Sequence, residues 1–278
     1  MAFDNILKSI ISDFSEDKSN FLYISLPKQL IEETPDLLKD TSFSVINLTR
    51  NFAPIKPFMQ ILKECNPSEE IINQNSYSLQ QETIQEYLLN GKAKERRDFI
   101  NHEEVFFEKT RITQTVSTII RNLCDKNYVI QNAQELSIEA IEIIKSLEKH
   151  RFNGKIIFCF DNEKIENSST ELQAFIDEKH KQNNFYEITN NEKFESKELS
   201  IKESVPTFDI LYNSLRDCRL LFSLDQGKTI SKWIISNIDS LKFSKNQKRL
   251  IHYEIAIISY LLSDTDEASY YLNNVLED

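Results

Sequence analysis

The chain has 278 residues, a length that favours two domains or one large one. It carries 44 Asp and Glu against 33 Lys and Arg, and the resulting net charge of −11 disfavours direct binding to nucleic acid or to an anionic membrane. Apolar residues make up 40%, enough for a sizeable core, and no apolar run is long enough to predict a membrane span. The N-terminus lacks signal-peptide features and the four cysteines are isolated, so we expect a cytoplasmic protein with reduced thiols.

Strands and helices alternate along the first two thirds of the chain. Short apolar runs predict the strands, and apolar residues spaced three and four apart predict the helices. The alternation indicates βαβ units, and hence an α/β fold with a five-stranded, mostly parallel sheet covered by helices on both faces. We expect the first strand at its centre and the third strand to end at Gln131-Asn132. The expected strands are 21–26, 42–49, 128–130, 155–160 and 185–188, and the expected helices are 3–14, 28–40, 57–66, 105–123, 137–147 and 170–180, with a polar, helix-prone stretch at 68–102.

Helical spacing alone remains after Pro206. The predicted organisation is therefore an α/β domain over 1–190, a linker over 191–206 and a set of antiparallel helices over 207–278. The sequence 227–229, Gly-Lys-Thr, looks like the end of a phosphate-binding loop. Position 222, where such a loop needs its first glycine, holds Phe222, so we expect Gly227 to cap one helix before another begins.

Glycine is scarce, with three in the whole chain, and they lie far apart. Phosphate-binding loops need closely spaced glycines for tight turns and close backbone approach, so the composition disfavours a standard nucleotide-binding enzyme. No histidine lies at metal-ligand spacing from a Cys, Asp or Glu, so no metal site is predicted. Asp161 ends the fourth strand, where α/β proteins place functional groups, but it is equally suited to capping the next turn.

The segment from Tyr128 to Ser137 is the most informative part of the chain. A buried strand runs directly into a polar loop and then into a helix, which is the arrangement of a Walker B segment. In such a segment a carboxylate at the strand end holds Mg²⁺. Here the strand ends in two amides, Gln131 and Asn132, which carry no charge and bind a hard divalent cation weakly.

Residues 1–190 resemble the P-loop NTPase domain of STAND-type AAA+ signalling ATPases. The element order is similar, and so are two segments: Phe52-Ala-Pro-Ile-Lys-Pro-Phe-Met59 after the second strand, and the Walker B-like segment, with Ala133-Gln134 retained and Asn132 at the acidic metal position. The sequence departs from this family at the positions that bind and hydrolyse the nucleotide. Ser25-Leu-Pro-Lys-Gln29 stands where the glycine-rich loop belongs, with Lys28 as its one candidate lysine, and Asp161 follows the strand that usually carries a sensor. The resemblance therefore implies a pseudo-ATPase with degenerate positions at Lys28, Gln131, Asn132 and Asp161.

The C-terminal helices resemble a tetratricopeptide repeat. Ala256, Ala268 and Leu272 stand at the small, small and large positions of that repeat, where small residues let paired helices approach closely. An ordinary helical hairpin also fits the pattern. The hairpin is expected at 245–262 and 265–277, with Asp264 and Thr265 capping its second helix. Because the repeat stops at the last residue, we expect the chain to be part of a longer protein.

Together these features predict a catalytically inactive, NTPase-like regulatory or scaffold module of intracellular signalling that binds a partner protein or an appended effector domain. No cofactor, metal or catalytic residue is expected. The expected contact surface carries Tyr253, Tyr260, Tyr270 and Tyr271, because tyrosines are enriched at interfaces. Two alternatives remain open: an enzyme that uses Asp161, Glu163 or Glu135 as acid and base, and a clamp-loader-like assembly subunit.

Overall fold

The computed structural model describes residues 8–14, 19–37, 42–49, 52–76, 81–94, 102–150, 152–182, 184–188 and 205–277. The chain divides into two compact units, each formed by two separate stretches. Residues 1–51 and 120–197 form the α/β unit, and residues 52–119 and 198–278 form the helical unit. The first half of the predicted helix 3–14 and most of the predicted linker, residues 191–204, lie outside the described residues. Within the described part of the chain, no helix combines the length and the apolarity needed to cross a membrane.

The α/β unit is built on a five-stranded sheet in which every neighbouring pair is parallel. This confirms the predicted α/β class. The spatial order is β2-β3-β4-β1-β5, so the middle strand is β4, and the prediction that the first strand is central was wrong. β1 lies between β4 and the short edge strand β5 because the connection from β4 crosses over β1. The strands are β1 (Phe21–Leu26), β2 (Phe43–Asn47), β3 (Asn127–Gln131), β4 (Ile156–Asp161) and β5 (Phe185–Glu187).

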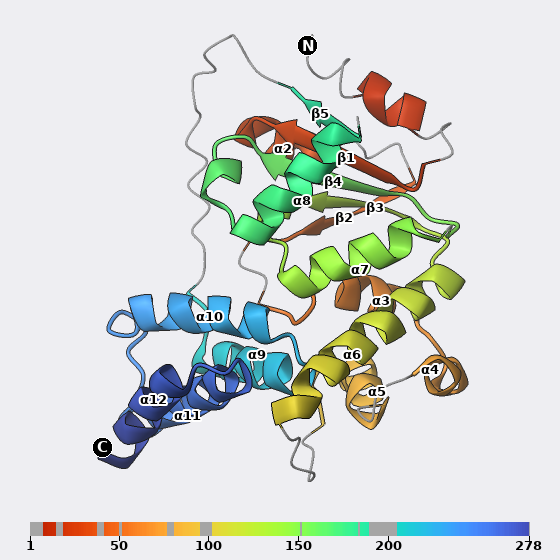
Figure 1. Cartoon of the computed structure of the whole chain (residues 1–278). Helices are drawn as coiled ribbons and strands as arrows, with labels where there is room; N and C mark the ends of the chain where they lie inside the picture. The colour runs from red at the N-terminus through yellow and green to blue at the C-terminus, as the bar shows by residue number, and fades with distance from the viewer. Residues whose placement is uncertain are drawn as a thin grey trace. The chain divides into compact units, whose positions relative to one another are not determined.

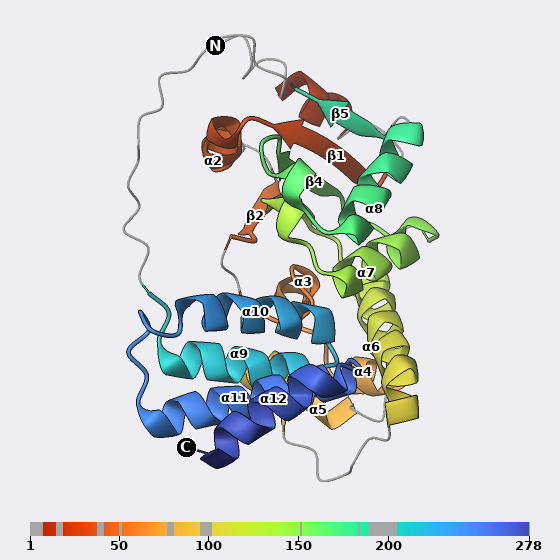
Figure 2. The same cartoon turned by 60° about the vertical axis from the view of Figure 1, so that its left-hand side comes forward.

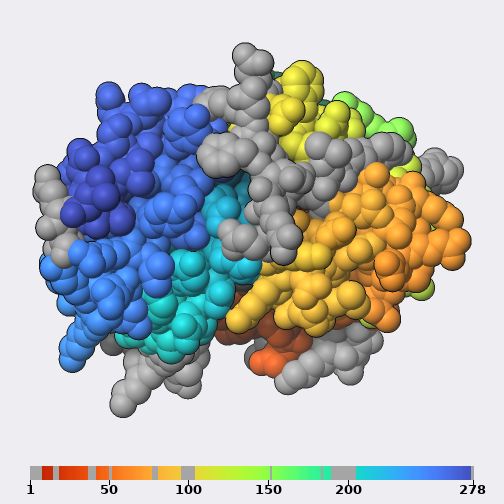
Figure 3. All heavy atoms as spheres, turned by 90° about the horizontal axis from the view of Figure 1, so that it is seen from below, coloured from red at the N-terminus to blue at the C-terminus, as the bar shows by residue number. Residues whose placement is uncertain are grey.

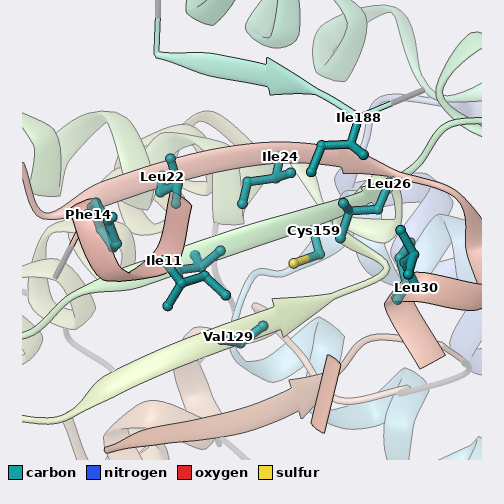
Figure 4. Close-up of a cluster of buried hydrophobic side chains, with 11 residues drawn as sticks. Ile11, Phe14, Leu22, Ile24, Leu26, Leu30, Val129, Cys159 and Ile188 are labelled. Carbon is teal, nitrogen blue, oxygen red and sulfur yellow. The ribbon is translucent and has the colours of Figure 1, made fainter. Parts of the chain in front are cut away.

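One face of the sheet packs on α2 (Lys28–Leu37) and on the helical residues 8–14. Successive side chains of a strand point to opposite faces, so Leu22, Ile24 and Leu26 of β1 share this face. Figure 4 shows these side chains together with Ile11 and Leu30, which reach the sheet from the two helical segments. This layer buries alternate residues of β1 and β4, and the remaining residues of both strands are buried on the opposite face, so both strands are continuous apolar runs.

The other face of the sheet is covered by α7 (Ile138–Glu148) and α8 (Thr170–Lys181) (Figure 1). Tyr23 of β1 stacks on Phe158 of β4, with ring centroids 5.3 Å apart, and meets the edge of Phe175 from α8 at 5.5 Å. Each helix begins at a serine whose hydroxyl accepts the backbone N–H three residues later: Ser137 for α7 and Ser169 for α8. These caps explain why the two helices begin where the sequence pattern places them.

The helical unit contains more of the chain than the segment 207–278 that the sequence predicts to be helical. Residues 52–119, placed in the α/β domain by the alternation of elements, pack with the C-terminal helices. Three contacts show why: the Ile55 N–H donates to Ser223, the Ala93 N–H donates to Asp217, and Lys109 pairs with Asp225 at 2.7 Å. The helices of this unit are α3 (Phe58–Cys65), α4 (Glu69–Asn75), α5 (Gln81–Asn90), α6 (His102–Leu123, up to Ile119), α9 (Phe208–Leu220), α10 (Leu224–Asn237), α11 (Lys245–Leu261) and α12 (Thr265–Glu277).

Helices α9, α10 and α11 enclose one apolar core, and Figure 2 shows them lying side by side. The predicted role of Gly227 as a helix cap was wrong. The preceding helix already ends at Leu220, and Gly227 lies in the first turn of α10, where its N–H donates to the Ser223 carbonyl. Its missing side chain matters there, because a Cβ would lie 3.0 Å from the Ile258 side chain of α11.

The predicted C-terminal hairpin is confirmed as two helices. α11 and α12 are joined by a turn in which the Asp264 carboxylate accepts the Glu267 N–H at 3.2 Å and so caps α12. Ala256 and Ala268 are 1% and 4% exposed. Small side chains at these positions let the two helices approach closely, whatever family the hairpin belongs to.

The buried alanine of α12 gives a first prediction. Ala268→Leu places three more carbon atoms in a position that is 4% exposed, and we expect it to destabilise the protein by about 1–3 kcal/mol through overpacking. Urea denaturation measures the change. Ser269→Leu is the matched control, because Ser269 is the next residue of the same helix and is exposed. An Ala268→Leu protein as stable as the control would show that the two helices do not pack closely at this position.

Candidate functional site

The candidate site is the edge of the sheet at which the parallel strands end. The chain leaves β1 toward β2 and leaves β4 toward β5, so the connections from these two adjacent strands run in opposite directions. Ligands of open α/β sheets bind at such a switch point, outside the carboxyl ends of the strands. In this protein the switch point lies beside Leu26 and Asp161, which are register partners.

The connection that follows β1 is a single residue, Pro27. β1 ends at Leu26 and α2 begins at Lys28, and the Pro27 carbonyl accepts the N–H groups of Leu30 and Ile31. A phosphate-binding loop presents several backbone N–H groups to its ligand, whereas one proline supplies none. Lys28 has a side chain that is 62% exposed and lies 3.9 Å from Glu32, one turn along its own helix.

The two amides at the end of β3 point in different directions. Gln131 is buried, and its side-chain N–H donates to the Ile31 carbonyl of α2, which ties β3 to that helix. Asn132 follows the strand in the left-handed conformation, with φ 57°, a region that asparagine tolerates better than most residues. The strand thus ends at Gln131, as the sequence predicts, and Asn132 starts the turn.

Side-chain amides form a continuous hydrogen-bonded chain across this edge, which we call the amide chain: Asn47, Asn132 and Gln134. The Asn132 Nδ2 group donates to Asn47 Oδ1 at 3.0 Å, and Gln134 Nε2 donates to Asn132 Oδ1 at 3.2 Å. Gln134 Oε1 in turn accepts the Asp161 N–H at 3.0 Å. The amide chain therefore links the ends of β2, β3 and β4 without any charged group.

Asn162 makes the corresponding connection on the other side of the switch point. Its Nδ2 donates to the Ile188 carbonyl at 3.0 Å, its Oδ1 accepts the hydroxyl of Ser25, and its N–H donates to the Leu26 carbonyl. β1, β4 and the end of β5 are thus joined through one residue. With the amide chain, these bonds connect the carboxyl ends of all five strands to one another.

Asp161 is 1% exposed and caps the turn that follows β4. Its Oδ1 accepts the Glu163 N–H at 3.1 Å, and its Oδ2 makes no hydrogen bond and lies 3.7 Å from the Lys164 ammonium. Of the two roles that the sequence left open, these contacts are those of the turn cap. Glu163 and Glu135 are exposed, and no hydrogen bond or ion pair joins the side chains of the three acids. The described residues include no group of three His, Cys, Asp or Glu that could hold a metal ion.

The sequence did not single out Asn47, Gln134 or Asn162 as members of this edge. A signal was present, because an amide residue stands at or just after the end of β2, β3 and β4. The pattern becomes informative only when the strands are known to be parallel, since only then do all three ends meet at one edge.

The four tyrosines predicted as a contact surface lie on α11 and α12 but not on one face. Tyr253 and Tyr260 are both 46% exposed, and Tyr270 is 62% exposed. Tyr271 is half-buried, with its ring centroid 5.5 Å from that of His252, and it packs against the core of the helical unit. Tyr271 is therefore mainly a packing residue.

A second concave region lies in the helical unit, between α3, α4 and α5. Its volume is about 430 Å³, and its charged groups include Lys63, the Lys94–Glu82 pair at 2.7 Å, and Glu86. Behind it, the Asp217 carboxylate accepts the Ala93 N–H at 2.9 Å and holds the turn that follows α5. Burial raises the pKa of Asp217 to about 6, although the Ala93 N–H and the charges of Arg216, Lys63 and Lys92 lower it.

The raised pKa of Asp217 predicts the pH dependence of stability. The folded protein holds this proton at a pH where the unfolded chain, with a pKa near 3.8, has lost it. The contribution of Asp217 to the free energy of unfolding therefore falls as pH rises from about 4 to about 6 and then stays level. Asp217→Asn removes the buried charge, and we expect it to stabilise the protein by about 2 kcal/mol at pH 7 and by little at pH 4.

Urea denaturation of the wild type and of Asp217→Asn at both pH values measures this effect. Asp209→Asn is the matched control, because Asp209 lies on the same helix and is exposed. If the wild type gained stability relative to Asp217→Asn between pH 4 and 6, the pKa of Asp217 would be lowered in the folded protein, and the prediction would be contradicted.

The chain was compared with known protein families, curated proteins and solved structures. No protein-family model, curated protein or solved structure matches the chain.

Proposed function

We propose that this protein is a catalytically inactive, NTPase-like regulatory or scaffold module in which the α/β unit serves as a rigid body and the helical unit makes contacts with protein partners. The single observation that carries the proposal is the one-residue connection between β1 and α2. In a nucleotide-binding α/β domain this connection supplies the N–H groups that bind phosphate.

The amide chain, at the ends of β2 and β3, supports the same proposal. Hydrolysis of a nucleotide needs a carboxylate that holds Mg²⁺ and a group that orients water. The corresponding positions carry Asn132, whose amide is bonded to Asn47 and Gln134, and Asp161, which is 1% exposed. Groups that satisfy one another stiffen the edge of the sheet, and this rigidity suits a scaffold.

The helical unit supports the part of the proposal that concerns partners. α9, α10, α11 and α12 form antiparallel pairs around one core, as in a helical repeat, and α11 and α12 expose Tyr253, Tyr260 and Tyr270. Tyrosine buries a large area with little loss of conformational entropy, so exposed tyrosines favour a contact surface.

A thermal-shift series with ATP, ADP and GTP, each with and without Mg²⁺, tests the inactive NTPase-like reading. A ligand at 100 times its Kd would stabilise the folded state by about 2.7 kcal/mol. We expect the melting temperature to stay unchanged for every nucleotide. A Mg²⁺-dependent rise with one nucleotide that disappears in Lys28→Ala would contradict the proposal.

A further inference from the structure

Helix α11 has two apolar faces, and among the described residues of the helical unit the core of α9 and α10 covers one of them. Ile251, Ile255 and Ile258 are each at most 1% exposed and pack in the core with α9 and α10. On the opposite face Leu250, Tyr253 and Tyr260 are 44%, 46% and 46% exposed, and Ile257 is half-buried. A helix that is apolar on two faces is normally covered on both.

The exposed apolar residues follow the spacing of a coiled-coil seam. Leu250, Tyr253, Ile257 and Tyr260 are separated by three, four and three residues, which places them in one row along the helix. We call this row the α11 seam. The third side of the helix is occupied by α12, where Ser259 donates to Glu267 at 3.0 Å and Ala256 is buried. The seam thus consists of other residues of α11 than those that pack in the core and those that face α12. In the space-filling view of Figure 3, the blue surface of α11 and α12 lies well apart from the orange surface of α4 and α5.

The two ends of the seam carry opposite charges. Arg249, beside the first seam residue, is half-buried, and its Nε is fully buried without a hydrogen-bond partner. At the other end of the seam the turn after α11 carries Asp264, Asp266 and Glu267 against one cation, Lys228, which pairs with Asp264 at 3.1 Å. The seam therefore has a basic end and an acidic end.

We propose that α11 pairs antiparallel with α11 of a second copy of this chain, across a two-fold axis near residues 253–257. In this arrangement Leu250 meets Tyr260 of the second copy, Tyr253 meets Ile257, and Arg249 lies beside the acidic turn at Asp264. A two-fold axis makes each contact twice, and the antiparallel direction also aligns the helix dipoles favourably. A parallel pair would instead place Arg249 beside Arg249. This proposal does not rest on the proposed function.

Sedimentation velocity of the full chain over a wide concentration range tests the association. We expect the mass to rise from 32.6 kDa toward twice that value as concentration increases. Tyr253→Glu puts a charge in the seam and should raise the dimer Kd at least about tenfold. Tyr270→Glu is the matched control, since Tyr270 is an equally suitable exposed tyrosine of the hairpin that lies outside the seam. Circular dichroism of both variants checks that they fold.

Cysteine cross-linking tests the direction. In a Cys65→Ser background, which removes the half-buried native thiol, we expect Leu250→Cys combined with Tyr260→Cys to form covalent dimers under mild oxidation. Leu250→Cys alone should not, because the two copies of residue 250 lie at opposite ends of the seam. A monomer at every concentration, or a dimer unaffected by Tyr253→Glu, would overturn the proposal. Efficient dimers from Leu250→Cys alone would overturn the antiparallel arrangement.

Discussion

Gly154→Ala is expected to destabilise the protein by about 3 kcal/mol, because no space exists for a Cβ at this position. A Cβ on Gly154 would overlap the carbonyl oxygen of Lys126 and would lie 3.1 Å from the Phe152 ring and 3.2 Å from the Cys124 sulfur. The backbone cannot easily move away. Asn20 holds it by donating to the carbonyls of Phe152 and Gly154, both at 2.7 Å.

Gly91→Ala is the matched control for this substitution. Gly91 has φ 73°, so alanine there is strained, at a cost of roughly 1–2 kcal/mol. The space beside it is open, with the Lys63 ammonium as the nearest atom at 3.6 Å. Urea denaturation should therefore rank Gly154→Ala as clearly the less stable protein. Equal stabilities would show that the turn before β4 is free to shift.

Glu148→Gln is expected to have an effect of similar size, about 3 kcal/mol, because it removes the nearer counter-ion of a buried ammonium and leaves only Glu178, at 3.7 Å. Lys179 has a side chain that is 1% exposed, and its Nζ lies 2.6 Å from Glu148 Oε2. Tyr23 donates to the other carboxylate oxygen at 2.7 Å. Burial, and then the neighbouring charge of Glu148, raises the pKa of Tyr23 well above its usual value, so the phenol stays protonated and donates.

The two partners of this ion pair are not equivalent. When Lys179→Met removes the ammonium, Glu148 keeps its bond to Tyr23 and, at 23% exposure, still reaches water. We therefore expect Lys179→Met to cost less than Glu148→Gln, and the double variant to cost less than the sum of the two. Denaturation of the three variants completes the cycle. A double variant with additive losses would show that the two charges do not interact.

The sequence was sufficient to predict the parallel sheet and most of its elements. β1 and β4 are buried over their whole length, so continuous apolar runs such as Phe21–Leu26 identified them without ambiguity. The hairpin of α11 and α12 was equally clear, because its features are local in the sequence. Asp264 caps the second helix, and the buried Ala256 and Ala268 lie within the same segment, 245–277, as that cap.

Features that depend on contacts between distant residues could not be predicted. The order of the strands, and hence the central place of β4, depends on which crossover passes over β1. The membership of residues 52–119 in the helical unit depends on single pairs such as Ala93 with Asp217 and Lys109 with Asp225. Neither pair is visible as a sequence pattern.

The candidate site was predicted in part. Gln131 and Asn132 were expected at the end of β3, and both are there. The amide chain that includes Asn132 was not predicted, because Asn47 and Gln134 acquire a common role only when the ends of β2 and β3 are adjacent. The buried pair of Lys179 and Glu148 was missed for the same reason, since 31 residues separate its members.

Isothermal titration calorimetry with ATP and Mg²⁺ tests the central claim most directly, namely that the α/β unit keeps an NTPase-like layout without a nucleotide site. With Pro27 as the whole connection between β1 and α2, and an amide at Asn132, we predict no binding heat at any ATP concentration that a cell could supply. Lys28→Ala should give the same result as the wild type. Micromolar ATP affinity in the wild type that is lost in Lys28→Ala would contradict the account.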